Sequence, residues 1–205
     1  MLVVAGLGAT AELARAQDAQ QPATTSENDT TSDVLKFLGG GAVGLAAHES
    51  GHLLFDAIFG AHARLEPVSF HGIPFFAITH DNGLTPRKEF VIDSAGFWVQ
   101  EGTNEWILSS RRNLRHESAP FTKGVVAFNV LTSFGYAGAA FARTGPVERD
   151  TRGMAESLGW KEPYVGLLIL APAVLDMIRY YRPDAPWAVW ASRGSKLFGV
   201  VLVFK

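Results

Sequence analysis

The sequence predicts an all-α membrane protein of about four to five helices, with a small β-hairpin after the first of them. Long stretches with almost no charged residues predict the helices, and an alternating segment broken by proline and glycine predicts the hairpin. Hydrophobic residues make up 47% and charged residues 19% of the 205 residues. This composition is more apolar than that of most soluble domains.

The first 33 residues are expected to lie outside the membrane-embedded domain, which we place at residues 34–205. Residues 1–13 form a short apolar run, and residues 14–16, Ala-Arg-Ala, have the small-x-small pattern that precedes signal-peptide cleavage. Residues 17–33 are mostly small and polar, and bury too little apolar surface to offset the entropy of ordering. We predict a signal peptide or a disordered tail, with the amino terminus exported.

The apolar stretches lie at residues 34–59, 124–142 and 164–181. At about 1.5 Å per residue in an α-helix, each can cross a hydrocarbon core about 30 Å thick. Four glycines between residues 39 and 44 favour close packing of the first stretch against another helix in lipid. We therefore expect these three stretches to be transmembrane helices.

Residues 64–79 alternate apolar and polar side chains around two prolines and a glycine. Alternation with a period of two is typical of strands, whereas proline and glycine mark turns. A hairpin of two short strands is therefore predicted directly after the first helix. The Asn82-Gly83 pair beyond it predicts a loop.

Residues 90–108 have helical periodicity but carry four strong polar groups within two turns. These groups are Gln100, Glu101, Asn104 and Glu105. Such a helix is costly in contact with lipid. The basic residues on either side of it, within 64–88 and 111–123, can share the cytoplasmic side only if this helix does not cross the membrane. We therefore expect a re-entrant helix or a helix buried inside the bundle.

The last apolar segment, residues 187–204, is interrupted by Arg193 and Lys196. One alternative is a short final span whose long cationic side chains reach the membrane interface. The other is a helix that lies in the membrane surface.

The composition also limits the chemistry of a functional site. The chain has no cysteine, so disulfides, thiol nucleophiles and cysteine-ligated metals are excluded, and metal ligands must be His, Asp or Glu. The net charge is −2 and the basic residues are scattered among acidic ones. We therefore expect no nucleic-acid partner.

Residues 48–52, His-Glu-Ser-Gly-His, form an HExxH motif in the first apolar stretch. On a helix, His48 and His52 lie one turn apart on one face, where they can bind one ion, for which Zn²⁺ is expected. Glu49 beside them is placed to act as a general base on water. Histidines that only pack and form hydrogen bonds are the alternative.

The run AAHESGHLLFDAIFGAHARLEPVSF, which contains this motif, resembles the first core helix and sheet element of the site-2 protease class of intramembrane zinc peptidases. The resemblance covers residues 34–79. In that class an aspartate on a later helix is the third metal ligand, which implies this role for Asp176, although Met177 stands where the class has glycine. The alternative for Asp176 is an ion pair with Arg179, three residues along the same helix.

A second resemblance implies a different third ligand. Residues 98–102, Trp-Val-Gln-Glu-Gly, are similar to the Trp-x-x-Glu-Gly element of gluzincin peptidases, in which the glutamate binds zinc. This implies the ligand role for Glu101, for which a partly solvated polar face is the alternative. Because two histidines and one carboxylate suffice for catalytic zinc, Asp176 and Glu101 both stay open as the third ligand.

The site-2 protease resemblance implies a membrane-embedded zinc metalloendopeptidase that hydrolyses a peptide or membrane-protein substrate, with Glu49 as general base. Membrane lipid then surrounds the protein, and a bacterial inner membrane is the expected location. One alternative is a non-catalytic membrane protein with a structural or sensory metal site. Another is a transporter whose intramembrane charges mark an ion path.

Several further polar residues have more ordinary interpretations. Asp150, in a stretch of mixed charge, is typical of a solvated turn or a helix cap, with a metal role left open. His71, His80 and Asp81 are expected to form turns, with substrate entry or support of the metal ligands as the alternative.

Overall fold

The computed structural model describes residues 24–70, 73–81 and 83–204. The expected signal peptide lies outside these residues, and a helix begins at Thr24, within the segment expected to be a tail. The chain divides into two units between Leu35 and Lys36. The second unit contains the helical bundle, the hairpin and the candidate site.

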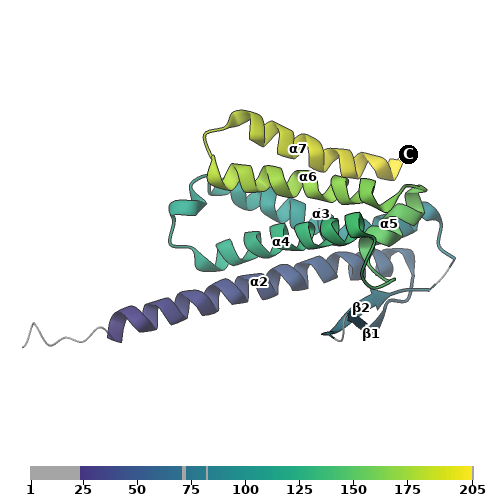
Figure 1. The fold of residues 1–205 in the computed structure, drawn as a ribbon, viewed down its shortest axis with the longest axis horizontal. Coiled ribbons are helices and arrows are strands. Elements are labelled where there is room, and N and C mark those ends of the chain that lie inside the picture. The colour runs from purple at the N-terminus through teal and green to yellow at the C-terminus, as the bar shows by residue number, and fades with distance from the viewer. Residues whose placement is uncertain (1–23, 71–72, 82, 205) are drawn as a thin grey trace, which may run out of the picture. The chain divides into compact units, whose positions relative to one another are not determined.

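The described chain contains six α-helices and one antiparallel hairpin (Figure 1). In order they are α2 (Thr24–Phe59), β1 (Arg64–Phe70), β2 (Ile73–Thr79), α3 (Pro86–Ser110), α4 (Pro120–Ala142), α5 (Asp150–Leu158), α6 (Glu162–Tyr181) and α7 (Pro186–Val201). Short 3₁₀ turns, Leu114–His116 and Leu202–Phe204, follow α3 and α7. The helical fold with a small hairpin is confirmed. The described helices outnumber the predicted four to five because the mixed-charge segment forms the short helix α5.

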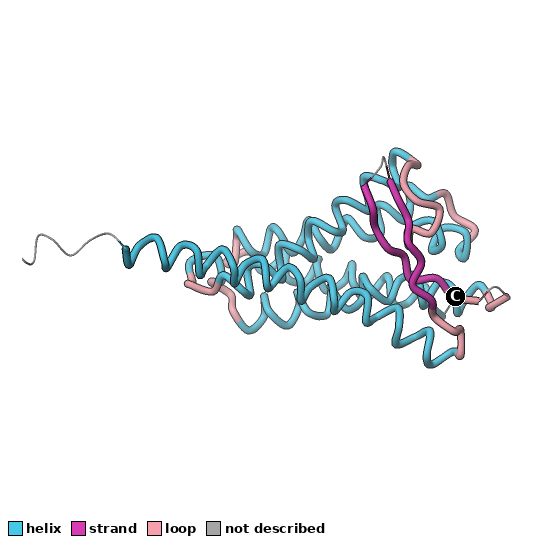
Figure 2. Tube along the Cα trace, turned by 90° about the horizontal axis from the view of Figure 1, so that it is seen from below, coloured by secondary structure: helices cyan, strands magenta, loops and turns pink. Residues whose placement is uncertain are grey.

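The hairpin is confirmed at the predicted position. Its strands pair in antiparallel register, with Arg64 opposite Thr79 and Phe70 opposite Ile73. The two strands lie beside the carboxyl end of α2 (Figure 2). They also share a cavity wall with the connection that leads into α5.

His80 joins the base of the hairpin to the helices. Its Nε2 lies 2.7 Å from Glu89 Oε2 on α3, and its Nδ1 lies 3.4 Å from Oδ1 of the buried Asp56 on α2. Asp81 instead accepts hydrogen bonds from His62 and Arg64 at the surface. His80 therefore anchors the strand that precedes it, while His71 lies outside the described residues.

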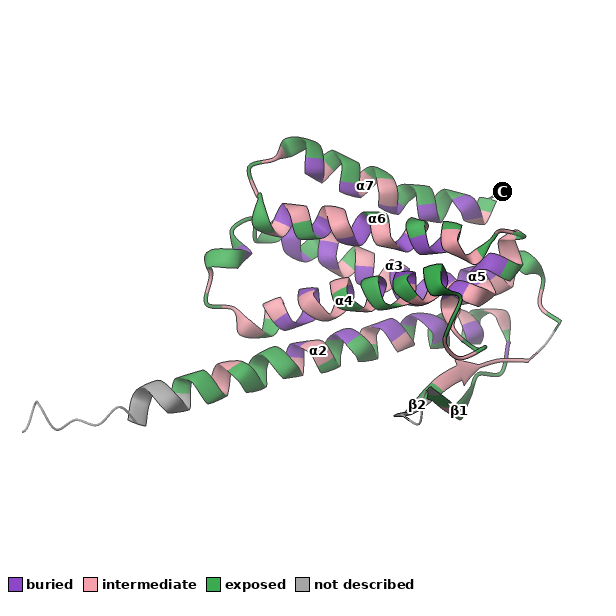
Figure 3. Cartoon of the chain, viewed as in Figure 1, coloured by how far each residue is buried: buried purple, intermediate pink, exposed green. Residues whose placement is uncertain are grey.

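Helix α3 is the buried helix of the bundle and contacts α4, α5, α6 and α7 (Figure 3). Its first half contributes Phe90 and Phe97 to the apolar core. Its second half buries Gln100 and Asn104, and Asn129 Nδ2 on α4 donates to Asn104 Oδ1 at 2.8 Å. The prediction of a helix buried inside the bundle is confirmed, because neighbouring helices cover its polar side chains.

Helix α3 has no reversal of direction at which a re-entrant segment could turn back. Helix α3 is continuous over 25 residues and runs from one end of the bundle to the other (Figure 1). The basic residues before it and after it therefore lie at opposite ends. The side of a membrane on which these basic residues lie stays a prediction.

Two described helices, α4 and α6, are long and apolar enough to cross a membrane. They correspond to the predicted spans at residues 124–142 and 164–181. Helix α2 is not among them. Its apolar stretch, residues 34–59, is interrupted by glycines, histidines and three charged residues, Lys36, Glu49 and Asp56. The composition of the described residues thus does not support the predicted span at 34–59.

Glycines bring α2 and α4 into backbone contact, as the sequence predicted for residues 39–44. A Cβ atom at Gly40 would collide with the carbonyl of Phe121, and one at Gly124 would collide with the carbonyl of Phe37. Gly44 leaves room for the ring of Phe128. This packing holds the helix that carries the HExxH motif directly against α4.

Candidate metal centre

His48, His52 and Asp150 bring three potential ligand atoms together, two from α2 and one from the start of α5. His48 Nε2 lies 3.2 Å from Asp150 Oδ2 and 3.2 Å from His52 Nε2. His52 Nε2 lies 3.6 Å from the same Asp150 oxygen. Among the residues that the structure describes, no other three His, Asp or Glu side chains lie close enough to share an ion.

The three atoms have the spacing of one face of a tetrahedral zinc site. Bonds of about 2.0–2.1 Å to a tetrahedral ion separate the ligand atoms by about 3.3–3.4 Å. The observed separations of 3.2, 3.2 and 3.6 Å lie around this value. The group can therefore hold a metal ion, and three protein ligands leave a fourth position for water or substrate.

A backbone contact orients the ring of His52. Its Nδ1 lies 2.8 Å from the carbonyl oxygen of Ile92 on α3, to which it donates a hydrogen bond. In the neutral imidazole, Nε2 then carries the lone pair and faces the Asp150 carboxylate. His52 Nε2 and the Asp150 oxygen both carry lone pairs and repel each other in this buried site. A metal ion or an added proton between them would remove the repulsion.

The ring of His48 fills space that a glycine leaves open. A Cβ atom on Gly96 of α3 would lie 2.6 Å from both Nδ1 and Nε2 of His48, and one on Gly51 would lie 2.7 Å from the Ala95 oxygen. Helices α2 and α3 thus meet backbone to backbone at the motif. His48 is 2% exposed, and its Nδ1 has no hydrogen-bond partner in the described part of the chain.

Asp150 is held in place through its neighbours in the sequence. Arg149 Nε and Nη2 each lie 2.7 Å from a carboxylate oxygen of Glu162, at the start of α6. Thr151 Oγ1 donates to Glu162 Oε1 at 3.0 Å. Both residues that flank Asp150 are therefore fixed to α6, which leaves the Asp150 side chain to point at the histidines.

The histidines also set the charge of the Asp150 side chain. Burial by itself would raise the pKa of this carboxyl, but the charge of His52 and hydrogen bonds from His48 and His52 hold the pKa well below its ordinary value. The carboxylate is therefore ionised at neutral pH, as a metal ligand must be.

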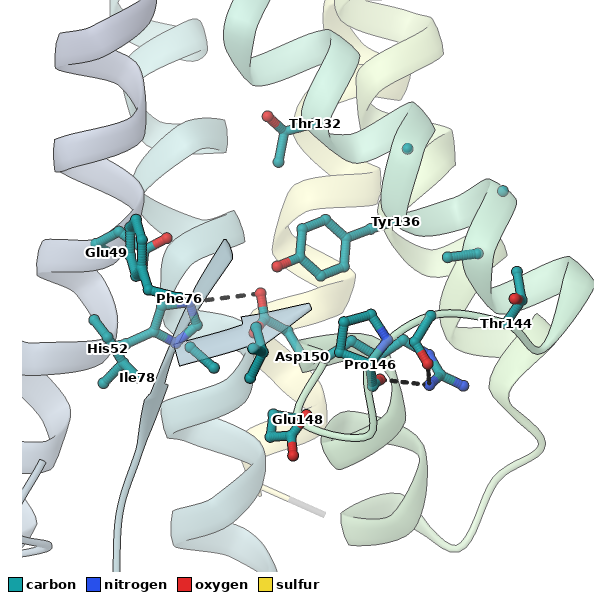
Figure 4. A pocket seen from close by; sticks show the side chains of 17 residues that line it. Glu49, His52, Phe76, Ile78, Thr132, Tyr136, Thr144, Pro146, Glu148 and Asp150 are labelled. Carbon is teal, nitrogen blue, oxygen red and sulfur yellow. Dashed lines mark hydrogen bonds and ion pairs between the residues drawn. The ribbon is translucent and has the colours of Figure 1, made fainter. Parts of the chain in front are cut away.

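A cavity of about 610 Å³ opens beside these residues (Figure 4). Glu49 and His52 reach it from α2, Tyr136 reaches it from α4, and Asp150 lies between them. The hairpin and α4 supply most of the remaining wall, including Val68, Phe76, Ile78, Thr132, Gly135 and Ala139. Glu49 is thus open to the same space as two of the three potential ligands.

Comparisons of the chain with protein-family models, with curated proteins and with solved structures find no match. The resemblance of residues 34–79 to the site-2 protease class therefore rests on the motif and the hairpin. The interpretation of the centre rests on its own geometry.

The structure places Asp176 away from the histidines. On α6, its Oδ1 accepts hydrogen bonds from Ser192 Oγ at 2.7 Å and Lys196 Nζ at 2.8 Å, both on α7. Arg179 Nη1 lies 3.5 Å from the same oxygen, which confirms the ion pair weighed as the alternative. The prediction of Asp176 as third ligand is corrected, because its carboxylate binds α7 and is not part of the group on α2 and α5.

Glu101 does not join the histidines either. Its charge interacts with Lys196 and Asp176, so it belongs to the polar contact of α3 with α6 and α7. Glu105, one turn further along, accepts hydrogen bonds from Arg179, Arg193 and Lys196. The prediction of Glu101 as third ligand is corrected, because its side chain is not part of the His48, His52 and Asp150 group.

Sequence reasoning favoured a turn or cap for Asp150 and left a metal role open, and the order of the helices is the one signal that could have favoured the metal role. Helices that alternate in direction place the connection after α4 at the same end of the bundle as the HExxH turn of α2 (Figure 1). An aspartate in that connection is within reach of the histidines. No spacing rule marks it, because 102 residues separate Asp150 from His48.

Replacing Gly96 with alanine is expected to weaken zinc binding at least about tenfold, because the methyl group must displace the His48 ring from its position. Gly102 on the same helix is the matched control, since a Cβ atom there meets nothing within 4 Å. Gly102→Ala should keep the zinc affinity and stabilise the helix by about 0.5–1 kcal/mol. Titration against a competing chelator measures both affinities. Equal affinity in Gly96→Ala and the original chain would contradict the placement of His48.

Replacing Asp176 with alanine is expected to lower the free energy of unfolding by about 3–5 kcal/mol, because Lys196 and Arg179 lose a buried anion. Asp184 lies exposed in the connection between α6 and α7, and Asp184→Ala should change stability by at most about 0.5 kcal/mol. Denaturant unfolding in detergent compares the two. Similar losses in both variants would show that the Asp176 contacts do not hold α6 to α7.

Proposed function

We propose that the chain is a membrane-embedded zinc peptidase, with His48, His52 and Asp150 as metal ligands and Glu49 as general base. One observation carries the proposal: Glu49, His52 and Asp150 open on the same cavity. A catalytic metal needs an open coordination position and space for a substrate, whereas a structural zinc site is closed by four protein ligands. The coincidence of ligands, base and cavity supports hydrolysis over a purely structural site.

In peptide hydrolysis, the metal would activate the substrate and the water, and Glu49 would transfer the proton. Zn²⁺, when bound, supplies a Lewis acid that polarises the scissile carbonyl and lowers the pKa of water. Glu49 accepts a proton from water while the water oxygen bonds to the carbonyl carbon. Glu49 then delivers the proton to the amide nitrogen as the carbon–nitrogen bond breaks. A carboxylic acid and an amine leave, and Glu49 is again a carboxylate.

The wall of the cavity supports an apolar peptide as substrate. Val68, Phe76 and Ile78 of the hairpin face Thr132 and Ala139 of α4 across it. Binding sites with mostly apolar walls and a few polar groups favour ligands of the same character. A segment of a membrane protein, or an apolar peptide, has this chemistry.

The distribution of polarity supports a location in the membrane. Buried positions of the bundle hold Asn104, Asn129, Asp176, Arg179 and Lys196, whereas outward positions expose large apolar side chains. The exposed set includes Leu131, Phe141, Leu167, Trp190 and Leu197. Soluble proteins rarely expose so much apolar surface, and ionisable residues of membrane proteins face the bundle interior.

Cleavage of a defined peptide mixture tests the proposal. The chain is purified in detergent, stripped with a chelator, and incubated with a library of apolar peptides before and after one equivalent of zinc is restored. Mass spectrometry should find new peptide termini only in the zinc-restored sample. A filled site that cleaves nothing would instead favour the structural or sensory metal site.

A further inference from the structure

Tyr136 lies across the cavity from Glu49 and has no part in the hydrolysis described above. Tyr136, Glu49 and Asp150 line the same cavity. Figure 4 shows the phenol oxygen pointing from α4 toward Asp150. The hydroxyl therefore ends where the base, the ligands and the cavity meet.

Aromatic contacts fix the direction of this side chain. The Tyr136 ring packs edge-on against Phe97 of α3, with ring centroids 5.2 Å apart, and its centroid lies 6.2 Å from that of His48. Phe97 is itself 2% exposed and packs edge-on against His48. A phenol held between two buried rings has little freedom to turn away, which is the condition for a preorganised donor.

The direction of the phenol suits a donor to the substrate. Its oxygen points toward Asp150, which would hold the ion together with His48 and His52. A carbonyl oxygen drawn to the ion would then come within hydrogen-bond reach of the phenol. A cation on Oδ2 of Asp150 also withdraws charge from that carboxylate, which weakens it as the competing acceptor.

We propose that Tyr136 is a catalytic hydrogen-bond donor that stabilises the negative charge on the substrate carbonyl oxygen during attack by water. The inference rests on the proposed peptidase function. The hydroxyl donates a hydrogen bond to the substrate oxygen and keeps its proton throughout. All proton transfer stays with Glu49, so the balance of the reaction is unchanged.

Binding of acetohydroxamate to the cobalt-loaded protein tests the inference without a known substrate. The hydroxamate binds the metal through oxygen atoms and presents an anionic oxygen where the substrate oxygen would lie. Three proteins are compared: the original chain, Tyr136→Phe, and the matched control Tyr164→Phe, whose hydroxyl is on the exposed amino end of α6. The cobalt content of each is measured first, and visible absorption then follows the hydroxamate titration.

Tyr136→Phe should bind one cobalt ion per chain, as the original chain does, and bind acetohydroxamate about tenfold more weakly. Tyr164→Phe should match the original chain in both measurements. On any peptide that the original chain cleaves, Tyr136→Phe should lower kcat by roughly 10²–10³-fold with little change in KM.

Three other outcomes would overturn the inference, and each would identify a different error in it. Equal hydroxamate affinity in Tyr136→Phe and the original chain would show that the phenol does not face the ligand. Loss of cobalt from Tyr136→Phe would show that the phenol acts by positioning Asp150, and not as a donor to substrate. A failure of the original chain to bind cobalt would overturn the metal centre itself, and with it both proposals.

Discussion

Asp150→Ala is expected to lower zinc affinity by at least about 100-fold, because it removes one of three ligands and leaves two imidazoles to hold the ion. The same variant should stay folded, since Arg149 and Thr151 still tie the start of α5 to Glu162. Zinc content after dialysis, and titration against a competing chelator, measure the change. Circular dichroism checks that the helical content is kept.

Two conservative variants are the matched controls for this prediction. Asp176→Asn and Glu101→Gln remove the other two candidate carboxylates while they keep a polar group in the contact with α7. Both should keep the zinc affinity of the original chain, because their side chains take no part in the His48, His52 and Asp150 group. Loss of zinc from either control, with Asp150→Ala unaffected, would restore the third ligand that the sequence implied.

Glu49→Gln is expected to reduce peptide hydrolysis by roughly 10²–10⁴-fold while the bound zinc is retained, because the amide cannot take a proton from water. Glutamine has the shape of glutamate, so the cavity and the neighbouring histidines should be preserved. Glu156→Gln is the matched control, since Glu156 is an exposed residue of α5 that pairs with Arg152. It should cleave at the original rate.

The pair of measurements separates the possible functions. Zinc retained with activity lost is the signature of a general base beside an intact metal centre. Undiminished cleavage by Glu49→Gln would contradict the assigned role. Zinc bound by both proteins with no cleavage by either would leave a structural or sensory centre as the function.

The local parts of the fold could be predicted from the sequence, because their signals lie within a few residues of each other. The hairpin follows from alternation and turn residues over 16 positions, and it forms where predicted. His48 and His52 lie on one helical face because they are four residues apart. The glycines at residues 39–44 likewise predicted close helix packing. The structure adds that Gly40 and Gly44 are the ones that contact α4.

Motif spacing could not single out Asp150 as the third ligand, because its position depends on contacts distant in sequence. Asp150 reaches the histidines only because Arg149 and Thr151 bind Glu162, and because Gly153 lets α5 pack on Asp93 of α3. Its sequence neighbourhood is polar and charged, as in many solvated turns.

The two carboxylates that the sequence favoured illustrate the opposite difficulty. A charged residue in an apolar helix can be a metal ligand or one half of an ion pair, and both uses leave the same pattern in the sequence. Asp176 pairs with Arg179 of α6 and with Lys196 of α7, which the sequence placed at a membrane interface. The charge of the same lysine acts on Glu101. The structure distinguishes a metal ligand from an ion-pair partner because it shows which cations lie beside each carboxylate.

X-ray absorption at the zinc edge tests the central claim that His48, His52 and Asp150 together hold one ion. The account predicts one zinc per chain, with four to five nitrogen or oxygen neighbours at about 2.0–2.2 Å and the outer-shell scattering of two imidazoles. It predicts one imidazole fewer in any zinc-loaded sample of His48→Ala. A spectrum without imidazole scattering, or one that is the same in His48→Ala, would contradict it.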